Sequence, residues 1–231
     1  MKFQHPLTKA TLIKRYKRFL ADVRLEDGSI VVAHCANSGS MKGCQPEGAD
    51  VYLSPNTNPK AKLDWRWELV DAGGTLVGIN TSHPNKLAEE AILDGTIKEL
   101  QGYEMLRREV KYGENSRIDL LLENPQLCYV EVKNVTLTDG KDQARFPDAV
   151  TARGTKHLKE LGTMVEDGHR AVMLYIVQRG DCSHFTPASD IDPTYATALK
   201  DAHTKGVEIL CYQCKVTPTE IKIVAPLPFH L

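Results

Sequence analysis

The feature that most limits the possible folds of this chain is a change of pattern near residue 80. Before it, short segments rich in Val, Ile and Tyr alternate with clusters of turn residues, which is typical of β-strands. Residues 26–29 and 71–74 each predict a hairpin, because their Asp and Gly residues tolerate a positive φ. Short strands in this number suit a small barrel; an oligonucleotide-binding (OB) barrel is one common solution and an SH3-like barrel is the rival. The expected strands are Ala10–Leu25, Ile30–Ala36, Ala49–Leu53, Leu63–Asp71 and Thr75–Ile79.

Beyond the polar segment Asn80–Asn85 the pattern becomes a mixture of helices and strands. The segment Ala171–Gln178 is continuously apolar and predicts a strand that is buried on both faces. The chain is therefore predicted to be α/β overall, with a barrel domain at residues 1–82 and a mixed α/β domain at residues 83–231. We expect helices at Pro84–Leu100, Ala149–Glu166 and Pro193–Lys205, and further strands at Glu109–Tyr112, Arg117–Glu123, Leu127–Lys133, Glu208–Val216 and Glu220–Val224.

The charge of the chain is unevenly distributed. Its 231 residues have a formal net charge of -1, which excludes a protein that is basic throughout. Residues 1–24, however, contain seven basic residues and one acidic residue, so this segment carries +6 and the remainder -7. A basic stripe interleaved with aromatic side chains can bind phosphates and stack on bases, although a solvated strand face explains it equally well. The candidate nucleic-acid contacts in the stripe are Arg15, Lys17, Arg18 and Phe19.

The sequence gives no sign of a membrane or of secretion. Its longest apolar stretch, Ala171–Val177, is far shorter than the ~20 residues of a spanning helix. The N-terminal residues lack the apolar core of a signal peptide. The six cysteines are therefore expected to be reduced thiols in a cytoplasmic protein. Cys211 and Cys214 form a lone CxxC on a predicted strand, for which two core thiols are a better interpretation than a zinc site.

The segment Ser116–Lys133 carries the clearest indication of chemistry. Two apolar strands flank an Asn-Pro turn, and a turn centred on Pro125 would place Asp119 opposite Glu131, on the face shared by Lys133. A register slip of one residue would separate the two carboxylates. Facing carboxylates repel unless a cation lies between them, so the pairing predicts a Mg²⁺ or Mn²⁺ site. The alternative is that Glu-x-Lys is a chance pair on a solvated strand.

Two neighbouring helices offer further candidate site residues. Glu89 or Glu90 of the first could supply a third carboxylate, and we prefer Glu90 because the other side of that helix is apolar. The helix after the hairpin has an apolar stripe that includes Val150 and Gly154, the latter permitting close approach to the sheet. Beside it lie residues that could hold phosphates, or could form an exposed face paired with Glu160: Arg153, Lys156 and His157.

Over essentially its whole length the sequence resembles the sugar fermentation stimulation protein family. The resemblance is carried by the segments 15–20, 34–41, 80–85, 116–119, 131–137 and 146–157, which read RYKRFL, HCANSGSM, NTSHPN, SRID, EVKNVTL and FPDAVTARGTKH. It implies an N-terminal OB-like barrel followed by a PD-(D/E)xK nuclease-like domain, with Asp119, Glu131 and Lys133 at the nuclease triad. Ile118 stands where the motif's name has a proline. Arg117, in the same motif, is a further candidate nucleic-acid contact.

The resemblance also implies two alternative functions. One is a Mg²⁺-dependent nuclease whose barrel holds the strand and whose metal is held by Asp119 and Glu131; to these we add Glu90, the third carboxylate preferred from the helix pattern. The other is a non-catalytic DNA-binding regulator of sugar use, maltose in particular. Both imply binding of DNA, with RNA as a second candidate, and little sequence preference; the sequence carries no signal for an oligomeric state.

Overall fold

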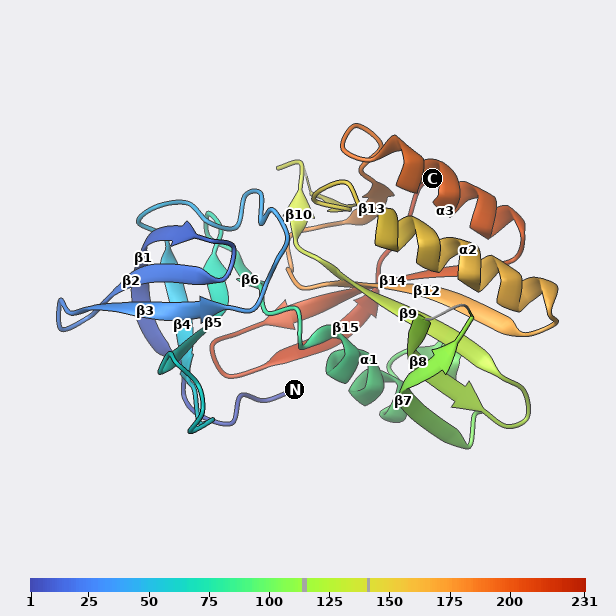
Figure 1. Cartoon of the computed structure of the whole chain (residues 1–231), viewed down its shortest axis with the longest axis horizontal. Helices are drawn as coiled ribbons and strands as arrows, with labels where there is room; N and C mark the ends of the chain where they lie inside the picture. Colours follow the sequence, from blue (N-terminus) through green and yellow to red (C-terminus); the bar gives the residue numbers. More distant parts are fainter. Residues whose placement is uncertain (114–115, 141) are drawn as a thin grey trace.

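The computed structural model describes residues 1–113, 116–140 and 142–231. Two lobes lie side by side along its long axis: a barrel formed by the N-terminal strands and a larger sheet flanked by helices (Figure 1). No helix among these residues is long and apolar enough to cross a membrane. The predicted order of a barrel followed by a mixed α/β domain is confirmed.

The first lobe is a barrel with OB topology. Its strands follow the order β3-β2-β1-β4-β5-β6, and a parallel pairing of β3 with β5 closes the sheet on itself. Alternate side chains point inward, so Ala21, Ala33 and Trp67 are completely buried in its core. This closure supports the OB barrel over the SH3-like rival. The strands are β1 (Thr8–Tyr16), β2 (Leu20–Leu25), β3 (Ile30–Cys35), β4 (Asp50–Pro55), β5 (Trp65–Asp71) and β6 (Leu76–Gly78).

The expected strand Ala10–Leu25 is wrong, because the chain turns back in its middle. β1 and β2 are antiparallel and are joined by a turn at residues 17–19. Lys17 and Arg18 make that turn with φ values of 48° and 64°. Neither Lys nor Arg is favoured in this conformation. The turn contains no Gly, Asn or Asp, which are the residues that would have predicted it.

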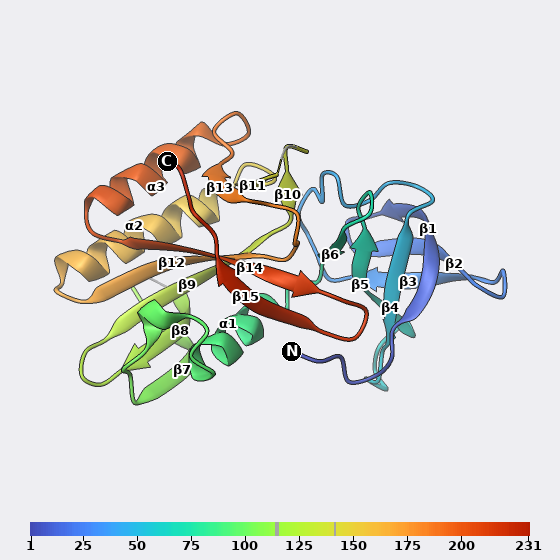
Figure 2. The same cartoon turned by 180° about the vertical axis from the view of Figure 1, so that it is seen from behind.

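The second lobe is a six-stranded mixed sheet with helices on both faces. Its order is β15-β14-β12-β9-β8-β7, with β12 parallel to both of its neighbours (Figure 2). The helices α2 and α3 cover one face and α1 covers the other, each over its own core. The predicted burial of β12 on both faces is confirmed. The elements are α1 (Pro84–Leu93), β7 (Met105–Tyr112), β8 (Ser116–Glu123), β9 (Cys128–Val135), α2 (Ala152–Glu166), β12 (Arg170–Val177), α3 (Pro193–Thr204), β14 (Glu208–Val216) and β15 (Ile221–Pro226).

Several boundaries in the second lobe differ from the expected ones. α1 ends at Leu93 instead of Leu100, because Gly95 follows with a φ of 81° and only a short 3₁₀ turn, Lys98–Leu100, comes after it. α2 begins at Ala152, where the Thr151 side chain accepts the Gly154 N–H, so Val150 lies outside the helix and is 76% exposed. A small sheet that the sequence did not indicate is formed by β10 (Leu137–Thr138), β11 (Gln143–Phe146) and β13 (His184–Pro187).

The two lobes are joined by direct contacts. The Gly78 N–H donates to the Gln178 carbonyl at 2.9 Å, and a Cβ on Gly78 would lie 2.4 Å from Gln178 Oε1, so only glycine fits there without displacing that side chain. Residues 1–82 were expected to form the barrel, but the first residues lie elsewhere. Met1 and Phe3 pack on the second lobe beside β15. The barrel itself begins only at β1.

Candidate metal centre on the β8–β9 hairpin

The β8–β9 hairpin has the register predicted from the turn at Pro125. Leu120 pairs with Val130 and Leu122 pairs with Cys128, so paired numbers sum to 250 as predicted. Val130 and Val132 pack in the core under α1, whereas Glu131 and Lys133 point to the α2 side. The described pairing stops at Leu120, and the Asp119 carboxylate itself accepts the Val132 N–H at 2.8 Å.

Glu131 is a buried carboxylate with one oxygen satisfied and one left over. Its Oε1 accepts hydrogen bonds from Lys133 Nζ at 2.6 Å and from His157 Nδ1. Its Oε2 is buried and has no hydrogen-bond partner among the described residues. Burial alone would raise the pKa of Glu131, but the His157 hydrogen bond and the Lys133 charge outweigh it and hold that pKa below its usual value. The carboxylate is therefore ionised, and its unpartnered Oε2 could bind a cation.

Asp119 is held from two sides. Besides the Val132 N–H, it accepts the Asn85 side-chain amide at 2.8 Å, which comes from the first turn of α1. Burial, followed by the negative charge of Glu131, raises the pKa of Asp119. A cation between the two carboxylates would remove this repulsion. Asn85 lies in the segment 80–85 that carries the family resemblance, but its contact with Asp119 was not predicted.

The hydrogen bonds around His157 define its tautomer. Nδ1 donates to Glu131, and Nε2 accepts from Arg153 Nε at 3.3 Å, so the pattern is that of a neutral ring. Lys133 Nζ lies 3.3 Å from the same Nδ1. The side chain of Lys133 is only 14% exposed, so its charge acts where solvent screens it weakly. His157 thus lies in the cluster as predicted, as a partner of Glu131.

A second set of unpartnered polar atoms lies beside the carboxylates. The Tyr112 hydroxyl and Glu160 Oε2 are buried and, like Glu131 Oε2, have no hydrogen-bond partner among the described residues. Burial and the charges of Glu131, Glu160 and Asp119 raise the pKa of Tyr112, so its phenol stays protonated near these acids. Glu160 Oε1 accepts from Ser116 Oγ at 2.8 Å. Tyr112 and Glu160 were not predicted as site residues, because an isolated Tyr or Glu gives no pattern.

The cluster provides two carboxylates, those of Asp119 and Glu131, as ligands for a divalent cation. Within residues 1–113, 116–140 and 142–231, no three His, Cys, Asp or Glu side chains form a group that could hold a metal ion. The preference for Glu90 as third ligand is wrong: its carboxylate binds the Met1 ammonium at 2.7 Å, on the side of α1 that faces β15. Glu89, near Arg108 of β7, lies one turn after Asn85. Mg²⁺ usually takes one or two carboxylates and keeps several waters, so Asp119 and the free oxygen of Glu131 fit it.

Gly154, Cys211 and Cys214 are packing residues of the second lobe. A Cβ on Gly154 would lie 2.8 Å from Thr151 and 3.0 Å from Tyr195 of α3, so the glycine allows approach of that helix and not of the sheet. Cys211 and Cys214 are buried free thiols in the cores on opposite faces of the sheet. The interpretation as core thiols is confirmed.

The other predicted nucleic-acid contacts are scattered. Arg153 touches His157, but Lys156 is exposed and pairs with Glu160 at 3.5 Å, as the simpler interpretation had it. Arg117 is an exposed residue of β8 opposite Lys111 of β7. The exposed residues Lys17, Arg18 and Phe19 form the β1–β2 turn.

Arg15 differs from the other residues of the basic stripe. Its guanidinium donates to the carbonyls of Asn37 at 2.8 Å, Gly39 at 3.0 Å and Arg18 at 3.0 Å. These bonds hold the loop after β3 against the β1–β2 turn. Arg15 is therefore a structural residue of the barrel.

Comparison with known proteins agrees with this architecture. Residues 13–79 match the family model described as "SfsA N-terminal OB domain", and residues 82–220 match "Sugar fermentation stimulation protein RE domain". Curated relatives named "Sugar fermentation stimulation protein homolog" include one from Paramagnetospirillum magneticum, 58% identical over 100% of this chain and 98% of the relative. Another, from Geobacter sulfurreducens, is 57% identical over 96% of each chain.

A solved structure has the same fold. It is described as Pyrococcus furiosus SfsA in complex with Ca²⁺, and it aligns with a TM-score of 0.91 at 29% identity, over 100% of this chain and 98% of that chain. The two family models together span both lobes, and the curated relatives match nearly end to end. The chain belongs to the sugar fermentation stimulation protein family.

Proposed function

We propose that this chain is a divalent-metal-dependent nuclease that hydrolyses phosphodiesters in DNA or RNA with little sequence preference. The observation that carries the proposal is the unpartnered buried oxygen of Glu131, which lies beside Asp119 and Lys133. Mg²⁺ or Mn²⁺ is the proposed cofactor, held by Asp119 and Glu131. The Ca²⁺ described for the Pyrococcus furiosus relative supports a hard divalent cation at this family's sites.

Each residue has a defined part in the proposed reaction. A bound cation would supply charge to offset the phosphoryl transition state and acidify a water. Asp119 stays oriented through Asn85 and the Val132 N–H. Lys133 donates hydrogen bonds to the attacking water or to a phosphate oxygen, while His157 keeps Glu131 in place. Hydrolysis forms one P–O bond to water, breaks another to the departing nucleotide oxygen, and passes a proton to that oxygen.

A non-catalytic DNA-binding regulator of sugar use is the second candidate. The observation that favours it is the compensation already present around Glu131: the Lys133 ammonium balances its charge and His157 donates a hydrogen bond to it, without any metal. A cluster of this kind could persist as a phosphate-binding device in a protein that no longer cleaves. The two candidates differ in turnover, which a direct assay measures.

The test is incubation of the purified protein with single-stranded and double-stranded DNA and RNA, with and without Mg²⁺ or Mn²⁺. Glu131→Ala and Lys133→Ala are expected to abolish cleavage, and Glu90→Ala, a carboxylate held elsewhere on α1, is the matched control that retains it. Cleavage that persists equally in the two site variants would come from a contaminant and would refute the nuclease. Tight retention of DNA without any cleavage would favour the regulator.

A further inference from the structure

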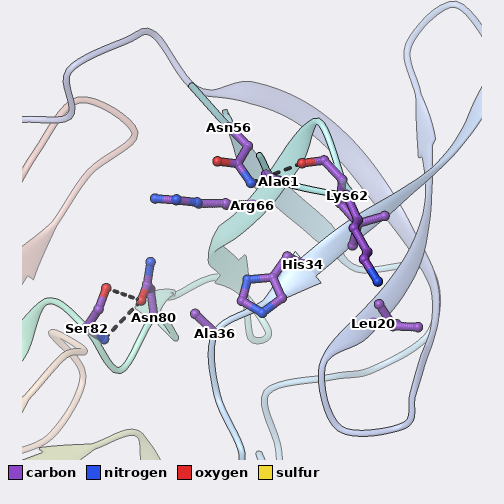
Figure 3. A pocket seen from close by; sticks show the side chains of 10 residues that line it. Leu20, His34, Ala36, Asn56, Ala61, Lys62, Arg66, Asn80 and Ser82 are labelled. Atoms are coloured by element: carbon purple, nitrogen blue, oxygen red, sulfur yellow. Dashed lines mark hydrogen bonds between the residues drawn. The ribbon is translucent and has the colours of Figure 1, made fainter. Parts of the chain in front are cut away.

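A cavity of about 680 Å³ opens on the outer surface of the barrel (Figure 3). Its floor is a row of side chains across three neighbouring strands. Leu20 of β2 pairs with His34 of β3, and His34 pairs in turn with Arg66 of β5. Since their neighbours Ala21, Ala33 and Trp67 are completely buried, this row points outward by the alternation of the strands. The loop between β4 and β5 forms a second wall.

The cavity combines apolar walls with cations that have no counterion. Among the described residues, the cationic side chains of Arg66 and Lys62 form no hydrogen bond or ion pair, and none of the described residues lining the cavity is acidic. Unpaired cations next to apolar surface fit a ligand with a phosphate and a flat apolar face. The volume falls within the ordinary range of ligand pockets, ~300–1,000 Å³, which an unpaired nucleotide suits and a duplex does not.

The side-chain amides that line the cavity already form hydrogen bonds with neighbouring groups of the protein. Asn80 Nδ2 donates to Glu68 at 2.7 Å, while Asn80 Oδ1 accepts both the N–H and the hydroxyl of Ser82. Asn56 Nδ2 donates to the Leu63 carbonyl. These amides therefore hold the walls in shape and leave little capacity to read base edges, so binding should depend on phosphates and on base faces.

The cavity is also close to the candidate metal centre along the chain. Ser82 lines it, and Asn85, three residues later, contacts Asp119. The Cα atoms of Ser82 and Asn85 can be no more than about 11 Å apart. A strand anchored in the cavity could thus continue along the segment 82–85 toward the carboxylates.

We propose that this cavity binds an unpaired nucleotide of a single strand, with the base against Leu20 and His34 and the flanking phosphates on Arg66 and Lys62. The proposal rests on the nucleic-acid role proposed above and names the form of nucleic acid that the barrel selects. The face of β2 and β3 and the loops beside it are where OB folds generally take oligonucleotides.

The test is fluorescence anisotropy with a labelled dT 12-mer and with a blunt 12-base-pair duplex, both in EDTA so that no cleavage occurs. The full chain is expected to bind the single strand at least about fivefold more tightly than the duplex, which is the lower end of what stacking of one base contributes. Arg66→Ala should weaken binding of the single strand about tenfold and reduce the salt slope by about 0.7. Arg66 is exposed and has no partner in the described part of the chain, so this variant should fold normally, which its melting temperature checks.

The matched control is Arg24→Ala, which removes one exposed charge, without an ion pair among the described residues, from the same barrel outside the cavity. An equal loss in both variants would mean that only the overall charge matters and would overturn the proposal. The proposal would also be overturned if the chain bound the duplex more tightly than the single strand, or if maltose displaced the strand. It would be overturned too if dTMP displaced the labelled strand as effectively, per mole, as unlabelled strand does, because that result would indicate a site for free nucleotides. Pocket-dependent binding without cleavage in Mg²⁺ would reject the nuclease alone, and cleavage unaffected by Arg66→Ala would reject the pocket alone.

Discussion

The side-chain amide of Asn85 donates to Asp119 Oδ1 at 2.8 Å, which ties the first turn of α1 to the carboxylate pair on the sheet. Asn85→Ala should lower the rate of Mn²⁺-dependent cleavage by about 10-fold, the lower end of the effect of losing a group that orients a metal ligand. Because Asn85 lowers the pKa of Asp119, the loss should be smaller at higher pH, where Asp119 ionises without that help. A pH–rate profile measures both. Lys86→Ala, at the next position on the helix, is the control; an unchanged rate in Asn85→Ala would contradict the assignment.

Addition of Mg²⁺ or Ca²⁺ should stabilise the folded chain. At a metal concentration of 100 times Kd the gain is about 2.7 kcal/mol, or roughly 5–10 °C in melting temperature for a chain of this size. Glu131→Gln should abolish the shift because it removes a ligand charge, whereas Glu90→Gln should keep it, because Glu90 binds the Met1 ammonium instead. Thermal melts with metal and with EDTA give the answer. An equal shift in Glu131→Gln would place the metal elsewhere.

Arg15→Ala should destabilise the barrel, because the loop after β3 loses the donor to its carbonyls at Asn37 and Gly39. The expected cost is about 1–3 kcal/mol. Lys17→Ala, in the exposed turn nearby, should leave the melting temperature unchanged and at most weaken nucleic-acid binding. Chemical denaturation of the two variants compares them. Equal stability would mean that the guanidinium contributes only charge.

Glu68 should make stability dependent on acid pH. It is 3% exposed and accepts hydrogen bonds from Ser54, Asn80 and His83, which together outweigh the effect of burial and lower its pKa below the ordinary 4.5. A depressed folded pKa gives stability that is complete above pH 4.5 and is lost as pH falls through the folded value. Glu68→Gln should therefore melt about 4–8 °C below wild type at pH 7, for a loss of roughly 2 kcal/mol, with the gap closing as the pH falls from 4.5 through the folded pKa of Glu68. A gap that stays constant with pH would show that the charge is immaterial.

The sequence predicted those parts of the fold that local patterning determines. The apolar alternation around Pro125 predicted the hairpin register, since a slip would have exposed its buried face. The turn at Lys17 and Arg18 was missed because tertiary contacts, including those of Arg15, impose a positive φ on residues that do not favour it.

The candidate site was predictable only in part. Glu131 and Lys133 share a strand face, so their spacing is enough to bring them together. Asn85 and Glu160 reach the cluster from helices whose packing on the sheet is decided by distant residues. The choice of Glu90 failed because the apolar face of α1 did not specify which flank would meet the hairpin and which would meet Met1.

Gly78 joins the barrel to the sheet: its N–H donates to the Gln178 carbonyl, and a Cβ at this position would displace the Gln178 side chain. If this junction is rigid, the distance between the cavity proposed to bind a strand and the carboxylates is constant, so the molecule would cut at a fixed distance from the bound end. Cleavage of an end-anchored strand would then release fragments of one narrow length, whatever their base composition. Enlarging residue 78 would shift that length or spread it, and the cut position would report the mechanical coupling of the two lobes.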